Sequence, residues 1–307
     1  MSRLVPRRVF AQLSLLLGFP GALGCERSTA FEVRRPGAAP QVFDATDFLT
    51  NDLDLVVRLD LKQLRLALGP DALLKLHAQA ENQGAKTGAF GQALEQAHSA
   101  WLALRPSVSA ATTDSVLVLS GDFSTTDLHR QDPATWSPAL ALGGLLRVYE
   151  RRGSAKRAEP ARAYAHGDDT LVFVSVAEID SVERVIAAGP DEKRLEPMAS
   201  GLLSFQLRPR VLPVFLAARA PKLSGLLEQA RKVSGLLESE GETLKVSVEV
   251  LFLTEQAAAE ALSLIRQLLA VSKELYPKFG GALNALQTQA QGVSLLLSVR
   301  LSQSYFR

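Results

Sequence analysis

Two segments near the C-terminal end of the chain alternate between apolar and polar residues. In TLKVSVEVLF, apolar side chains recur at every second position from Leu244 to Phe252, and in VSLLLSVRLS they recur from Val293 to Leu301. A period of two places these side chains on one face of a β-strand and leaves the other face largely to solvent. Half-buried strands of this kind belong to antiparallel sheets that helices cover on one side. The sequence therefore predicts an α+β fold.

Further strand and helix signals run through the chain from about residue 53. Pro209 and Pro213 favour edge positions for two short strands, because proline cannot donate to a sheet ladder. Thr254 is placed to cap a following helix, and Pro221 to begin one. The predicted strands are 53–60, 115–120, 145–152, 161–165, 170–176, 201–207, 212–217, 243–253 and 292–302, and the predicted helical regions are 61–104 with breaks at 69–70 and 84–91, 177–188, 221–239 and 255–275.

The order strand, helix, strand, helix recurs in both halves of the chain. VLVLSGDFSTTDL is loosely echoed by VEVLFLTEQAAAEAL, and duplication of a ferredoxin-like unit would explain the repetition. A shift in composition over residues 189–200 marks the expected boundary. We therefore expect a first α+β half at 46–190 and a second at 191–307.

The first 24 residues follow the three-part pattern of a secretory signal peptide. Arg3, Arg7 and Arg8 precede an apolar run over residues 9–24 that ends in small residues. The run is shorter than the roughly 20 residues that span a bilayer as a helix. We therefore expect residues 1–24 to be removed.

The residues at the end of this run resemble the lipobox of bacterial lipoproteins. The sequence Ala22-Leu23-Gly24-Cys25 places a small residue directly before the only cysteine of the chain. The resemblance implies that the chain is cut before Cys25, which becomes the first mature residue and carries a diacylglycerol. Ordinary signal cleavage with a free thiol and an uncut N-terminal helix are the alternatives.

Lipidation of Cys25 would fix where the protein works. Several acyl chains on one residue hold a protein stably at a membrane, whereas one chain holds it only marginally. The resemblance to lipoproteins implies a place in the cell envelope, and Glu26 favours the outer over the inner membrane, because the retention signal of that family is more typically Asp. Residues 25–45, rich in Pro and Gly, are then a flexible tether with a reach on the order of 25 Å.

Charge and cysteine content exclude several classes of function. The chain has 34 basic and 32 acidic residues, and removal of residues 1–24 leaves 31 basic against 32 acidic. A nearly neutral mature chain lacks the basic surface that nucleic-acid binding requires. One cysteine allows no intramolecular disulfide and no cysteine-based zinc site. We expect no nucleic-acid partner and no cofactor.

No sequence motif for catalysis stands out. The chain contains no GxSxG, HExxH or phosphate-binding loop. His77 and His98 are expected on helices, where nothing brings them together, and solvated histidines are the simplest interpretation of both. His166, Asp168 and Asp169 form the most site-like cluster and are the weak candidates for a metal or acid/base site.

The same cluster has a structural explanation. Gly167, Asp168 and Asp169 lie between two predicted strands, where a hairpin turn favours Gly and Asp. Asp122 and Asp127 likewise fit a turn and a helix cap. The turn is the favoured interpretation.

The sequence leaves three functions open. The first is a non-catalytic envelope lipoprotein whose α+β domain presents a surface to a protein or cell-wall partner. The second is a carrier or chaperone of apolar ligands, for which Leu-rich helical stripes would line a cavity rather than pack a solid core. The third is a hydrolase that uses the neighbourhood of His166.

Overall fold

The structure is a computed structural model that describes Val42 and residues 44–69, 88–106, 113–139, 146–153, 159–211, 221–275 and 280–302. The predicted signal peptide, Cys25, most of the tether, His77 and the strand predicted at 212–217 lie outside the described residues. In the part of the chain that is described, no helix is both long and apolar enough to cross a membrane.

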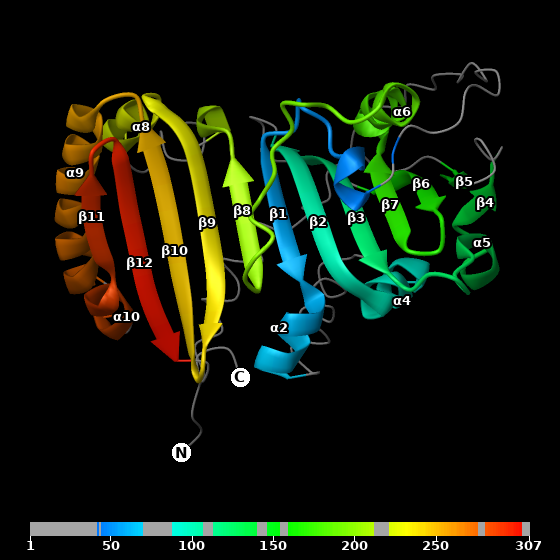
Figure 1. The fold of residues 1–307 in the computed structure, drawn as a ribbon, viewed down its shortest axis with the longest axis horizontal. Helices are drawn as coiled ribbons and strands as arrows, with labels where there is room; N and C mark the ends of the chain where they lie inside the picture. The colour runs from blue at the N-terminus through cyan, green and yellow to red at the C-terminus, as the bar shows by residue number, and fades with distance from the viewer. Residues whose placement is uncertain are drawn as a thin grey trace.

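The described residues form one antiparallel sheet of 12 strands (Figure 1). The predicted α+β class is confirmed at this level. Across the sheet, the strands are β11 (Gln287–Gln291), β12 (Ser294–Ser302), β10 (Thr243–Phe252), β9 (Ala230–Glu240), β8 (Leu203–Leu207), β1 (Leu55–Asp60), β2 (Ala97–Pro106), β3 (Thr113–Gly121), β7 (Thr170–Ser175), β6 (Pro160–His166), β5 (Leu146–Arg151) and β4 (Trp136–Pro138).

Strand β8 joins the strands of the two halves into a continuous sheet. Leu207 of β8 pairs with Leu55 of β1 on one side and with Val233 of β9 on the other. Directly paired residues lie on the same face of a sheet, so one apolar row of the first half continues on the face that carries the apolar row of the second half. A ferredoxin-like duplication of the two halves is not shown by this strand order.

At the start of some helices, a side chain accepts a hydrogen bond from a free amide group of the first turn. Asp60 accepts from the Gln63 amide at 2.9 Å, and Thr254 accepts from the Ala257 amide at 3.2 Å, which confirms the predicted cap. The helical segments are η1 (Ala45–Phe48), α2 (Leu61–Leu68), α4 (Gly88–Gln96), α5 (Leu128–Gln131), η2 (Val176–Glu178), α6 (Ile179–Ala188), η3 (Pro209–Val211), α8 (Pro221–Leu227), α9 (Glu255–Leu275) and α10 (Gly280–Ala285).

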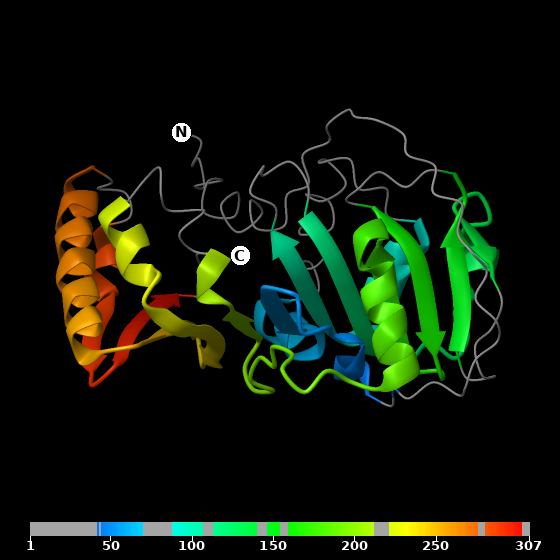
Figure 2. The ribbon, with the colours of Figure 1, turned by 90° about the horizontal axis from the view of Figure 1, so that it is seen from above.

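In the first half, helices cover both faces of the sheet (Figure 2). Val182 and Ile186 of α6 pack with Val172 and other valines of the sheet in one core cluster. Ala93 of α4 and Leu128 of α5 pack with residues of the opposite face in a second cluster. This half is therefore a three-layer arrangement.

In the second half, α8 and α9 cover one face, and a cluster around Phe252, Ala258 and Leu295 joins them to the sheet. Figure 1 looks onto the opposite face of β9, β10 and β12, on which no described helix lies. Residues on that face include Lys245, which contacts Glu238 at 3.7 Å and Glu240 at 3.6 Å.

Three sequence-based predictions of elements are wrong. Residues 97–104, predicted as helix, form most of β2, and residues 230–239, predicted as the end of a helix, lie in β9. Strand β8, predicted at an edge, lies inside the sheet, because Pro209 follows the strand and removes no ladder hydrogen bond from it.

Candidate apolar binding site

The most site-like cluster of the sequence lies on the tight turn between β6 and β7. Gly167 adopts a left-handed φ of 57°, and Asp168 and Asp169 are exposed. Their carbonyl groups accept hydrogen bonds from the amides of Phe123, at 2.7 Å, and Gly121, at 2.9 Å. The backbone of the turn therefore fixes the end of β3 to the β6–β7 hairpin.

The described histidines have separate surroundings. The ring of His166 meets Phe48 edge-on, with 6.0 Å between the ring centroids. Nδ1 of His129 lies 2.7 Å from the Trp136 carbonyl oxygen, and His98 is exposed on β2. Across the described ranges, no group of three or more His, Cys, Asp and Glu side chains is arranged to hold a metal ion.

A partly buried charge cluster lies at the other end of the same half. Arg105 reaches Asp52 at 2.6 Å and the fully buried Glu178 at 2.9 Å. Burial raises the pKa of Glu178 despite the nearby Arg105. Burial also acts to raise the pKa of Asp52, but hydrogen bonds from Thr50 and Arg105 outweigh it and lower that pKa. The cluster ties residues 50–52 to β2 and η2, which is a structural role.

A pocket of about 260 Å³ lies between the sheet and the helices α8 and α9. Helical spacing of four places Leu223 and Leu227 on one side of α8, and Ala261 and Ile265 on one side of α9. The period of two does the same for the strands. All of the described side chains that line the pocket are apolar, and those from the sheet are Phe205, Leu207, Val233, Val248, Val250, Leu295 and Leu297.

Small residues shape the packing around this pocket. A Cβ atom at Gly235 would lie 2.2 Å from Cε1 of Phe205, so the ring of Phe205 occupies the place that a side chain on β9 would take. On α9, Ala257, Ala258 and Ala261 are buried, which lets the helix approach the sheet. Only Ala261 of these three alanines lines the pocket, where its side chain is the smallest of the lining side chains.

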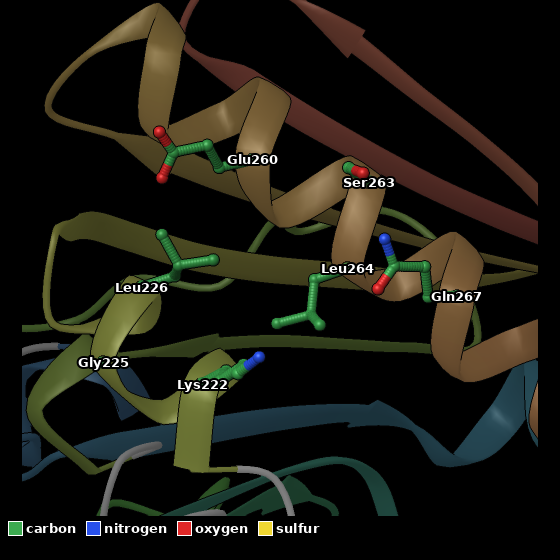
Figure 3. A pocket seen from close by; sticks show the side chains of 7 residues that line it. All are labelled: Lys222, Gly225, Leu226, Glu260, Ser263, Leu264 and Gln267. Atoms are coloured by element: carbon green, nitrogen blue, oxygen red, sulfur yellow. The ribbon is translucent and has the colours of Figure 1, made fainter.

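A groove of about 450 Å³ runs between α8 and α9 on their outer side (Figure 3). Leu226 of α8 and Leu264 of α9 point into it. Polar side chains surround these two leucines: Lys222, Glu260, Ser263 and Gln267. Gly225 also lines the groove, and a Cβ added there would meet no atom within 4 Å.

The groove and the pocket follow the same pair of helices on opposite sides. Leu226 lines the groove and also packs against the core cluster that contains the pocket residues Leu227, Val233 and Val250. Side chains on two helices, rather than a rigid wall of strands, therefore separate the two spaces.

Compared by sequence with known proteins, the chain matches no family model and no curated protein. Its fold is similar to solved structures of TP0453. Crystal form I is 11% identical, with a TM-score of 0.53 over 86% of this chain and 95% of that one. Form III is 10% identical, with a TM-score of 0.52 over 86% and 96%. At such low identity, the likeness shows the fold alone.

The sequence predicts that several pocket residues are buried, but it does not predict the pocket itself. Leu223 and Leu227 lie in the predicted helical region 221–239, and the apolar rows of β10 and β12 face a core as the alternation predicts. The remaining space depends on how far α8 and α9 stand from the sheet, and Ala261 is the one small residue in its lining.

Proposed function

We propose that this chain is a lipid-anchored protein of the cell envelope whose α+β domain binds an apolar ligand between the sheet and the helices α8 and α9. The observation that carries the proposal is the pocket of about 260 Å³ with its entirely apolar lining. Binding, rather than catalysis, is then the activity of the domain.

The chemistry of the pocket favours hydrocarbon over water. A water molecule occupies about 30 Å³ and needs two to four polar partners to be held well. The pocket has room for several waters but offers them no polar side chain. A hydrocarbon chain has no hydrogen bonds to lose there, and each methylene group that it buries contributes about 0.8 kcal/mol to binding.

The anchor is proposed from the sequence. The lipobox-like residues before Cys25 favour lipidation, and Glu26 favours the outer membrane. Labelled palmitate should be incorporated into the full chain and lost from a Cys25→Ser variant, which should also leave the membrane fraction. Labelling that persists in Cys25→Ser would contradict the anchor.

Native mass spectrometry of the purified full-length protein with palmitate tests the pocket. We expect one bound palmitate, and we expect Ala261→Leu to remove it, because the larger side chain takes up part of the pocket that the hydrocarbon chain would occupy. Ala187→Leu is the matched control, since Ala187 is exposed on α6 in the other half. Equal binding by all three proteins would refute the proposed site.

A second candidate function is docking of a protein or cell-wall partner. The open face of β9, β10 and β12 favours it, because no described helix covers this face. It carries polar residues such as the paired Ser247 and Ser298 beside Leu236 and Leu296. Purified peptidoglycan should retain the protein, and Ser298→Arg should reduce retention. Retention that is absent, or unchanged by Ser298→Arg, would count against this face as a cell-wall surface.

A further inference from the structure

The outer groove between α8 and α9 carries two opposite charges that form no ion pair with any other described residue. Lys222 and Glu260 lie on opposite sides of it in Figure 3 and do not pair with each other. Among the described residues, neither forms an ion pair, and Glu260 accepts a hydrogen bond only from the Gln256 amide group, at 2.9 Å. Both side chains are exposed, so each is free to meet a ligand in solution.

Below these charges, the lining of the groove becomes apolar. Leu226 and Leu264 are half-buried and face the space between the helices. Because Leu226 also packs against the core cluster around the pocket, a hydrocarbon chain that displaces these two leucines would pass from the groove to the pocket. Polar groups outside and apolar groups inside are the pattern of an amphiphile site.

The geometry points to a single-chain zwitterionic amphiphile as the ligand, with its hydrocarbon chain in the pocket and a phosphoethanolamine headgroup in the outer groove. This inference rests on the proposed function and names the class of ligand. Lys222 would bind the phosphate and Glu260 the primary ammonium, since charge-assisted hydrogen bonds are the strongest that such groups form. Ser263 and Gln267 would supply further hydrogen bonds to the headgroup.

The two charges together discriminate among headgroups. A fatty acid or a phosphoglycerol headgroup satisfies Lys222 but brings a negative charge near Glu260 with no cation to balance it. A phosphocholine headgroup supplies a cation that has no N–H to donate to the Glu260 carboxylate. Phosphoethanolamine satisfies both side chains.

Calorimetric titration of the purified full-length protein tests this inference, with four C16 probes kept below their micelle concentrations. The probes are lysophosphatidylethanolamine, lysophosphatidylcholine, lysophosphatidylglycerol and palmitate. We expect lysophosphatidylethanolamine to bind about tenfold more tightly than each of the other probes. Each of them lacks at least one charge-assisted hydrogen bond, and the loss of one such bond weakens binding about tenfold.

Charge variants at the groove provide the matched test. Lys222→Glu and Glu260→Lys should each weaken lysophosphatidylethanolamine binding about tenfold. Palmitate, which carries only a negative charge, should bind more weakly to Lys222→Glu and more tightly to Glu260→Lys. The double variant, which restores one charge of each sign, should recover most of the affinity. Both side chains are exposed, so folding should not change, and circular dichroism checks this.

The outcomes separate the inference from the function on which it rests. If all four probes bind equally and the charge variants bind as the original protein does, the headgroup inference is wrong while the apolar site stands. If no probe binds, or if Ala261→Leu binds every probe unchanged, the apolar site itself is refuted.

Discussion

Substitution of Ala261 by leucine should stabilise the protein while it abolishes ligand binding. Ala261 is fully buried on α9 and lines the apolar pocket. A leucine there adds three carbon atoms to the space, worth about 2.4 kcal/mol at about 0.8 kcal/mol each. Fixing the leucine rotamer costs about 0.5–1 kcal/mol. The net gain in the free energy of unfolding is therefore about 1.5–2 kcal/mol in the absence of ligand.

Thermal unfolding without ligand measures this gain. Each kcal/mol of added stability usually raises the unfolding midpoint of a domain of 150–250 residues by about 2–4 °C. We therefore expect the midpoint to rise by about 3–8 °C. Palmitate should raise the midpoint of the original protein and leave that of Ala261→Leu unchanged, because only a native state that binds is stabilised by mass action.

Ala258→Leu is the matched control for this experiment. Ala258 is also fully buried, lies one helical turn before Ala261 and does not line the pocket. The same substitution there overpacks the interface and should cost about 1–3 kcal/mol. If the two variants are destabilised alike, the space beside Ala261 does not exist in solution, and the reasoning fails.

Three further substitutions have expected outcomes. Gly225→Ala should raise the free energy of unfolding by about 0.5–1 kcal/mol in urea titrations, because alanine favours helix and its Cβ meets no atom; a loss would show that α8 is packed more tightly than the structure has it. Gly235→Ala should lose about 1–3 kcal/mol in the same assay, because the new Cβ must displace the ring of Phe205, and an unchanged stability would contradict that contact. The pKa of Asp52 is lower in the folded protein than the unfolded pKa near 3.8, so its negative charge stabilises the fold at pH values above 3.8. This stabilisation is lost as the pH falls through the lower pKa of the folded protein. Asp52→Asn should therefore lose less stability than the original protein on acidification from pH 5 to pH 2, and identical pH profiles would refute the role of Asp52.

The elements predicted best from the sequence are those that local chemistry determines. The helix Glu255–Leu275 begins at its Thr254 cap, and in the strands β10 and β12 every second residue is apolar. In these segments the period and the end signals agree, so one interpretation remains.

The predictions failed where one pattern fits two structures. Ala230, Val233 and Leu237 fit a helical stripe, but Val233, Gly235 and Leu237 equally form the inner row of a strand. Pairing with β8 and β10 decides in favour of the strand, and this pairing joins residues far apart in the sequence. For the same reason, the sequence predicts a helix at His98 and Trp101. Both residues lie in β2, which pairs with β1 and β3.

The pocket could not be predicted from the sequence, for a different reason. Apolar periodicity predicts that a side chain is covered, but it does not tell whether the covering residues fill the space. The pocket beside Ala261 and the groove around Gly225 depend on the distance and angle between two helices and the sheet.

A crystal structure of the protein with a fatty acid brominated at the end of its chain tests the apolar site most directly. The anomalous signal of bromine should appear between the sheet and α9, beside Ala261 and Leu295, and it should vanish from crystals of Ala261→Leu. Bromine found only on the outer surface, or no bromine at all at a saturating concentration, would contradict the account.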